Sequence, residues 1–96
     1  MRNTYIVCYD IRDAKRLRRV YKTMRDWGDH LQYSVFECHL SRREYVECRA
    51  CLSEIIHHDL DQVLFINLGP SRGRGERVIQ ALGLAYQAVD APCYVA

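Results

Sequence analysis

The sequence has no apolar run that approaches the ~18–20 residues needed to cross a membrane. Its first residues, Met1–Thr4, also lack the long apolar stretch and the small-residue cleavage site of a secretory signal. Ninety-six residues leave no room for a second hydrophobic core, and a hydrophobic content of 49% is too high for a disordered chain. We therefore expect one folded domain in the cytoplasm, with no membrane partner.

The chain also lacks the cysteine pattern of a disulfide framework. Five cysteines at irregular spacing, in a chain without an export signal, indicate free thiols. Cys48 and Cys51 form a CxxC pair, but no second pair with zinc-site spacing follows. Packing of these cysteines on a helix is the favoured interpretation. A metal-sensing module that uses them together with His39, His57 and His58 is the lesser alternative.

The net charge of +2 is small, but it is unevenly distributed. Residues 1–30 contain eight Lys or Arg against four Asp, a net charge of +4, whereas residues 31–70 contain three Arg against six acids, a net charge of −3. Basic charge gathered in one segment is typical of a surface that meets phosphate groups, although solvated helix faces are often basic as well.

The first thirty residues predict a strand followed by a basic helix. Residues 4–9 form a β-rich run with apolar side chains on both faces, which indicates an interior strand that ends at Asp10. Asp13 is a candidate N-cap of the helix, and Gly28 is its candidate C-terminal stop. The apolar residues of this helix recur at helical spacing and should face the core: Leu17, Val20, Tyr21, Met24 and Trp27.

Residues 31–40 alternate between apolar and polar side chains, but the phase of the alternation changes near Val35 and Phe36. A shift by one residue turns the side chains of a strand to the other face of its sheet. We therefore expect two short strands, or one bulged strand, with the break at this position.

A capping box predicts the second helix, because Ser41 is followed three residues later by Glu44. The apolar face of this helix carries Cys48 among other core residues. The helix should end near His57 and His58, whose imidazoles can bind its last carbonyl groups.

The last third of the chain predicts two more strands around a loop. Residues 63–66 are apolar on both faces, which again indicates an interior strand. Residues 69–75 form a loop rich in glycine and arginine that could meet a phosphate, but it lacks the lysine-hydroxyl ending of a P-loop. Residues 77–82 could form a last short strand.

This order of elements fits an α+β fold of ferredoxin-like type, a βαββαβ two-layer sandwich with an antiparallel sheet and two helices on one face. We assign residues 1–83 to this domain and residues 84–96 to a C-terminal tail that could be an arm packing on a dimer. Because two strands are apolar on both faces, we expect a second copy to cover the open face of the sheet, as a sheet-to-sheet homodimer.

Asp10 is the strongest candidate for chemistry, because it follows a central strand at a position typical of functional carboxylates. Beside arginines that bind phosphate, its oxygens suit a magnesium or manganese ion. One carboxylate supplies too few protein ligands for the ion, but a two-fold dimer that brings both copies of Asp10 together would supply two carboxylates. The competing interpretation, which the residues alone favour slightly, is that Asp10 only caps a turn or the first helix.

Two segments of the chain resemble the CRISPR-associated Cas2 family. Tyr5–Ile11, followed by Asp13 and the basic run Lys15–Val20, is similar to the start of that family. Gly28 and the segment Leu31–Cys38, which reads LQYSVFEC, are similar to its second signature. The order of the predicted elements extends the resemblance to about residue 82.

The resemblance implies a ferredoxin-like homodimer that acts in CRISPR adaptation, the acquisition of new spacers. By motif match Asp10 would be the metal ligand, together with its copy across the two-fold axis, and Tyr9 would lie beside it as a second catalytic residue. Phe36 would either contact a nucleotide or pack near the dimer centre, and residues 77–82 would pair with the partner subunit. The contacts to nucleic acid implied by the match are Arg16, Arg18, Arg19 and Phe36.

Two functions are compatible with these residues. The first is a magnesium-dependent endonuclease that hydrolyses phosphodiesters of RNA or double-stranded DNA. The alternative is a non-catalytic DNA-binding scaffold that bridges dimers of the CRISPR integrase Cas1. The sequence contains no motif that reads bases, so either function should show little sequence preference and should weaken with added salt.

Overall fold

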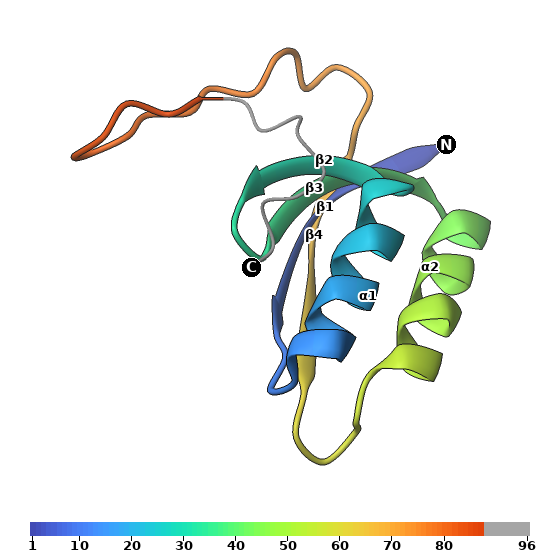
Figure 1. Cartoon of the computed structure of the whole chain (residues 1–96). Helices are drawn as coiled ribbons and strands as arrows, with labels where there is room; N and C mark the ends of the chain where they lie inside the picture. Colours follow the sequence, from blue (N-terminus) through green and yellow to red (C-terminus); the bar gives the residue numbers. More distant parts are fainter. Residues whose placement is uncertain (88–96) are drawn as a thin grey trace.

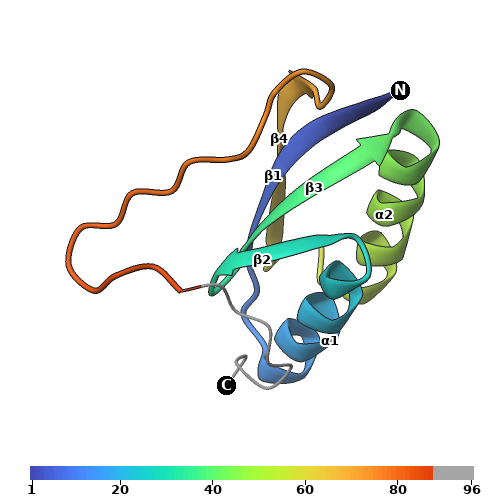
Figure 2. The same ribbon diagram turned by 90° about the horizontal axis from the view of Figure 1, so that it is seen from above.

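The computed structural model describes residues 1–87 and shows a four-stranded sheet with two helices packed on one of its faces (Figures 1 and 2). All neighbouring strands are antiparallel, and the strand order is β2-β3-β1-β4. This is the predicted ferredoxin-like βαββαβ sandwich. Its elements are β1 (Arg2–Asp10), α1 (Ala14–Arg25), β2 (Gly28–Gln32), β3 (Val35–Ser41), α2 (Arg42–Ile55) and β4 (Gln62–Pro70).

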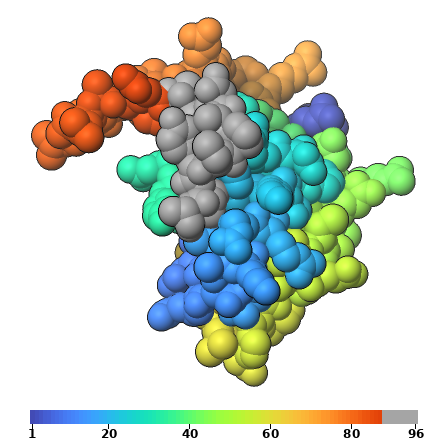
Figure 3. Space-filling view, viewed as in Figure 1, coloured from blue at the N-terminus to red at the C-terminus, as the bar shows by residue number. Residues whose placement is uncertain are grey.

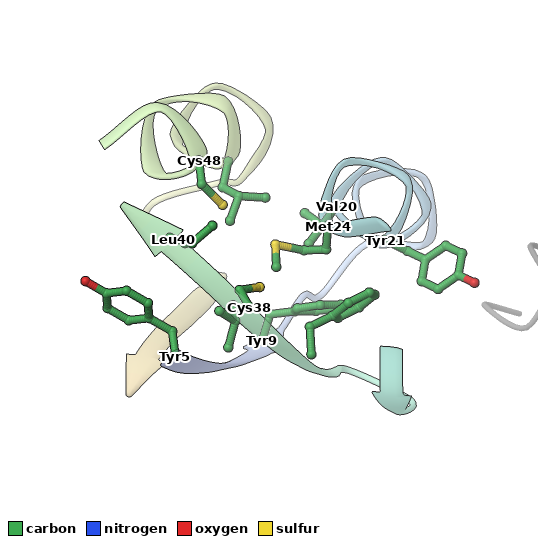
Figure 4. Close-up of a cluster of buried hydrophobic side chains, with 11 residues drawn as sticks. Tyr5, Tyr9, Val20, Tyr21, Met24, Cys38, Leu40 and Cys48 are labelled. Atoms are coloured by element: carbon green, nitrogen blue, oxygen red, sulfur yellow. The ribbon is translucent and has the colours of Figure 1, made fainter. Parts of the chain in front are cut away.

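The hydrophobic core lies between the two helices and the sheet face that they cover (Figure 4). Alternate residues of each strand reach it, because successive side chains of a strand point to opposite faces. From β1 these are Tyr5, Val7 and Tyr9. The other buried apolar residues come from α1, β3 and α2: Val20, Tyr21, Met24, Phe36, Cys38, Leu40, Cys48 and Leu52.

Both helices begin at the caps that the sequence predicts. The carboxylate of Asp13 accepts the backbone N–H of Arg16 at 3.0 Å. At the start of α2, Ser41 N–H donates to Glu44 Oε1 at 2.8 Å, and Glu44 N–H donates to Ser41 Oγ at 3.1 Å. At the other end of α2, His58 Nε2 donates to the carbonyl of Ser53 at 2.9 Å, which confirms the predicted imidazole–carbonyl contact.

Gly28 is not the stop of the first helix, as the sequence suggested, but the first residue of β2. Helix α1 ends earlier, at a C-cap formed by Asp26. A Cβ on residue 28 would lie 2.4 Å from the carbonyl oxygen of Glu37 and 2.5 Å from Cys38 Sγ. Glycine is therefore required here because β3 runs directly against the backbone of β2.

The predicted break near Val35 and Phe36 lies two residues earlier in the structure. Residues 28–41 form two strands, β2 and β3, and the turn between them is Tyr33 and Ser34. The two-strand alternative is therefore the correct one.

Strand β4 is an edge strand rather than the interior strand that the sequence indicated, since only β1 pairs with it among residues 1–87. Its even-numbered side chains face away from the helices and are exposed: Leu64 by 47%, Ile66 by 45% and Leu68 by 43%. Leu64 lies beside Cys8 of β1 and Ile66 lies beside Ile6, which are their cross-strand neighbours. We call the sheet face that carries these side chains the open face.

Residues 77–82 do not form the predicted last strand. They belong to the exit segment, residues 71–87, which has no regular helix or strand. The exit segment leaves the sheet after β4, projects as a long loop and returns toward β2 (Figures 2 and 3), where its later residues share a hollow with Leu31, Gln32 and Val35. The tail prediction for residues 84–96 lies largely outside the described residues.

No helix within residues 1–87 has the length and apolar character that crossing a membrane requires.

Candidate functional site

Asp10 is the last residue of β1, and its carboxylate points into solvent with 69% of the side chain exposed. Its nearest cation is Arg12, whose Nη2 lies 3.8 Å from Asp10 Oδ2, and that side chain is 67% exposed as well. An ion pair this open contributes little to stability. The carboxylate therefore remains available for a ligand from outside the chain.

A hollow of about 200 Å³ adjoins Asp10. Residues from the end of β1, from α1 and from the β2–β3 turn line it: Tyr9, Asp10, Ile11, Leu17, Tyr33 and Ser34. Backbone hydrogen bonding joins two of these parts, since Tyr9 N–H donates to the carbonyl of Ser34 at 3.1 Å. The hollow is wide enough for small groups beside the carboxylate, but it is not a closed cavity.

Tyr9 precedes Asp10 in the chain but points to the opposite face of the sheet. Its ring is buried in the core, 6.2 Å from the ring of Phe36 between centroids. Its hydroxyl is buried without a hydrogen-bond partner in the described structure. Burial raises the pKa of this phenol well above its ordinary value, so it stays protonated at neutral pH. The structure therefore buries the Tyr9 ring in the core, while other atoms of Tyr9 line the hollow beside Asp10.

Phe36 is completely buried between the sheet and α1. Its ring stacks on His30 with centroids 4.7 Å apart and lies 6.0 Å from the ring of Tyr21. Of the two roles that the sequence left open, a nucleotide contact would require this ring to leave the core. Its position is that of a packing residue within one chain.

Arg16, a predicted phosphate contact, is already occupied by a carboxylate that the sequence did not single out. Its Nε donates to Asp61 Oδ2 at 2.7 Å and its Nη2 to Asp61 Oδ1 at 3.1 Å. The side chain of Asp61 is fully buried, and a bidentate pair of this kind is strong. The structure thus makes Arg16 an internal partner rather than a free cation.

Arg18 and Arg19 lie on the exposed surface of α1, and no described residue forms an ion pair with either. Lys15 and Lys22 are exposed on the same helix. These four cations keep the basic surface that the sequence predicted, even though Arg16 does not contribute to it.

The described residues of one chain do not form a metal site by themselves. Within residues 1–87, no three His, Cys, Asp or Glu side chains gather closely enough to hold one. Magnesium prefers carboxylate oxygens and water, and Asp10 offers the carboxylate. A site for this ion at Asp10 fits only if a second copy supplies another carboxylate.

Only one member of the CxxC pair is a packing residue. Cys48 is buried in the core, and burial raises the pKa of its thiol to about 12. Cys51 is exposed on the outer side of α2. The alternative of a metal-sensing module therefore gains no support from these two residues.

Arg77 is a second residue that the sequence did not reveal. Its Nη1 donates to Glu37 Oε1 at 2.6 Å and to Asp29 Oδ2 at 3.1 Å. This contact holds the exit segment against the open face, where Glu37 is buried. Local sequence carries no signal for it, since the partners lie 40 and 48 positions away.

Comparison with known proteins places this arrangement in one family. The family model for CRISPR associated protein Cas2 matches residues 3–73. The CRISPR-associated endoribonuclease Cas2 of Geobacter sulfurreducens is 46% identical over 71 residues, which are 74% of this chain and 75% of that protein. The CRISPR-associated endoribonuclease Cas2 1 of Rhodospirillum rubrum is 35% identical over 88 residues, which are 92% of this chain and 85% of that protein.

Solved structures agree with these relatives. The crystal structure of Streptococcus pyogenes Cas2 at pH 6.5 has a TM-score of 0.67 and 34% identity, over 80% of this chain and 99% of that chain. Another crystal structure of Cas2 has a TM-score of 0.76 and 26% identity, over 95% of this chain and 98% of that chain.

Proposed function

The chain belongs to the CRISPR associated protein Cas2 family, and from this premise we propose that it is a dimeric endoribonuclease of CRISPR adaptation with Asp10 at its reaction centre. The relatives are named endoribonucleases, so RNA is the proposed substrate and double-stranded DNA the alternative. The observation that carries the proposal is the position of Asp10. It is the exposed carboxylate at the end of a central strand, within the matched segment.

The dimer is part of the proposal because one chain is incomplete in two respects. Its open face leaves Leu64, Ile66 and Leu68 exposed, and the outer edge of β4 pairs with no described strand. Exposed apolar surface and a free strand edge both favour association. A second copy packed on this face covers the apolar side chains and brings two Asp10 carboxylates to one interface. Residues 77–82 pair with the partner in this arrangement, as the family resemblance implied.

The proposed chemistry is metal-assisted hydrolysis of a phosphodiester. Asp10 and its copy in the partner would hold a magnesium or manganese ion, which would lower the pKa of a bound water and stabilise the charge that develops on the phosphate. The residues of the chain hold and orient the components. Asp10 provides the ligand oxygens, and Arg18 and Arg19 bind phosphates of the nucleic acid backbone.

A scaffold function is the second candidate, and the exposed basic surface of α1 favours it. Arg18 and Arg19 can bind DNA without any contribution from Asp10. In this alternative the dimer bridges the integrase Cas1 and needs no cleavage. The two candidates differ in whether the Asp10 carboxylate is required.

The test compares wild type with Asp10→Ala in cleavage of RNA and of double-stranded DNA with magnesium. We expect the substitution to lower the cleavage rate by roughly a hundredfold or more, because it removes the proposed metal ligand. Asp59→Ala, at an exposed carboxylate in the α2–β4 loop, is the matched control and should cleave like wild type. Equal cleavage by wild type and Asp10→Ala would reject the nuclease proposal. Binding without cleavage by both proteins would support the scaffold.

A further inference from the structure

Asp61 lies in the loop between α2 and β4, yet it binds three parts of the chain at once. Besides the two bonds from Arg16 of α1, Oδ1 accepts the backbone N–H of Arg12 at 2.9 Å. Oδ2 accepts the backbone N–H of His57 at 2.8 Å. The side chain is fully buried, and four donors from the β1–α1 loop, α1 and the start of the α2–β4 loop satisfy it.

One of these bonds fixes the loop that directly follows Asp10. Only residues 11–13 separate β1 from α1, and Asp61 holds the N–H of the middle one, Arg12. The far end of the loop is fixed by the N-cap bond of Asp13. The side chain of Arg12 in turn lies 3.8 Å from the Asp10 carboxylate.

From this geometry we infer that Asp61 is a positioning residue for Asp10, with Arg16 as the cation that holds Asp61 in place. This inference rests on the proposed function of Asp10. Asp61 does not touch the substrate or the ion in this role. It sets the course of the backbone from which the Asp10 carboxylate projects, so that the carboxylates of two copies can meet one ion.

The geometry explains why a carboxylate is needed at position 61. All four hydrogen bonds come from N–H donors, so both oxygens must be acceptors. An asparagine there replaces one oxygen with an NH₂ group. The N–H donors that bind this oxygen in the wild type would then face another N–H donor and lose their acceptor. The β1–α1 loop would then shift, and a displacement of about 1 Å at a reacting group can cost roughly a hundredfold in rate.

The experiment uses the full chain with Asp61→Asn and with Asp59→Asn as the matched control, a substitution two residues away at an exposed carboxylate. All measurements are made at a temperature where circular dichroism shows each protein folded. Three quantities are compared: the backbone order parameter of Asp10 from nitrogen relaxation, the broadening of Asp10 signals by added Mn²⁺, and kcat and KM for RNA cleavage.

We expect Asp61→Asn to lower the Asp10 order parameter, to raise the Mn²⁺ concentration needed for broadening, and to reduce kcat by about ten- to a hundredfold with KM unchanged. Asp59→Asn should match wild type in all three. A purely structural role would lower the thermal stability of folded Asp61→Asn and leave these three quantities unchanged, and that result would overturn the inference.

Two further arms keep the result decisive. If Asp61→Asn does not fold, the variant Arg16→Lys is measured instead. Lysine keeps the positive charge but cannot make the bidentate hydrogen bonds to Asp61. Wild-type values of all three quantities in Arg16→Lys would overturn the inference. If wild type neither binds Mn²⁺ at Asp10 nor cleaves RNA, the proposed function fails. The positioning role is then decided by the Asp10 order parameter alone, and an unchanged value would reject it.

Discussion

Single carboxylates join distant parts of this chain. Asp61 connects the β1–α1 loop, α1 and the start of the α2–β4 loop. Glu44 caps α2 and also accepts two bonds from Arg2 at the start of β1, at 3.0 and 3.1 Å. The hydrogen bonds from Arg2 lower the pKa of Glu44 from 4.5 to about 2, and those from Arg16 hold the pKa of Asp61 well below its usual range.

These lowered pKa values predict a loss of stability in acid. Both carboxyls have a lower pKa in the folded state than in the unfolded chain. The contribution of Glu44 is complete above its unfolded value near 4.5 and is lost as pH falls toward about 2, and that of Asp61 is complete above 3.8 and is lost at still lower pH. Urea unfolding followed by circular dichroism should therefore show the midpoint falling through this pH range. Asp61→Asn should show a shallower fall and Asp59→Asn a wild-type one. Identical slopes in all three proteins would contradict the prediction.

At the scale of elements, the β2–β3 hairpin depends on one residue without a side chain. Gly28 lets the backbone of β3 approach within 2.4 Å of the position that a Cβ would occupy. The atoms in the way include backbone of β3, which cannot rotate aside as a long side chain can. The second helix, by contrast, is set by its own capping box and does not depend on this approach.

Gly28→Ala should therefore displace β2 from β3 and destabilise the protein strongly, with a fall in Tm of roughly 10 °C or more, or a failure to fold. Thermal unfolding followed by circular dichroism measures it. Gly75→Ala is the control: its positive φ of 75° makes alanine unfavourable, but no atom lies within 4 Å of the added methyl. Its loss should be smaller, and an equal loss in both variants would contradict the crowding argument at Gly28.

The sequence predicts those elements whose signals are local. The N-caps Asp13 and Ser41 and the imidazole contact of His58 all act within five residues, and the structure confirms each of them. The edge position of β4 could not be predicted, because an apolar strand reads the same whether its own chain or a second copy covers it.

The candidate site was predicted less completely than the fold. The exposed position of Asp10 follows from the strand that precedes it. Because side chains alternate along a strand, Tyr9 and Asp10 point to opposite faces of the sheet. The motif resemblance had implied that Tyr9 lies beside Asp10. The pair of Arg16 and Asp61 could not be found, since 45 positions separate the two residues and nothing in the sequence distinguishes Asp61 from Asp59.

For the whole molecule, the open face determines whether the proposed site can exist. The face carries Ile66 near its middle, opposite Ile6 of β1. Because Asp10 lies at the end of the same sheet, one packing event would bury the apolar side chains and assemble the ligand set. Oligomeric state and activity are therefore linked in the proposal.

Ile66→Glu should convert the dimer to a monomer, since it places a charge on each side of the apolar contact. Sedimentation velocity measures the change, and RNA cleavage should be lost with the dimer. Leu60→Glu is the matched control, because Leu60 is 55% exposed but lies in the α2–β4 loop, away from the open face. A dimer that survives Ile66→Glu would show that the copies associate through another surface.

The free edge of β4 also has a consequence for handling the protein. A strand that ends a sheet with apolar side chains exposed is a template for pairing with any other extended chain. Dilution separates the copies that protect each other, so the melting temperature should rise with protein concentration. Dilution, or partial unfolding of the partner, would also expose the edge of β4 to incorrect pairing with other chains. Purification at high concentration would then be gentler on this protein than the dilute conditions usually chosen to prevent aggregation.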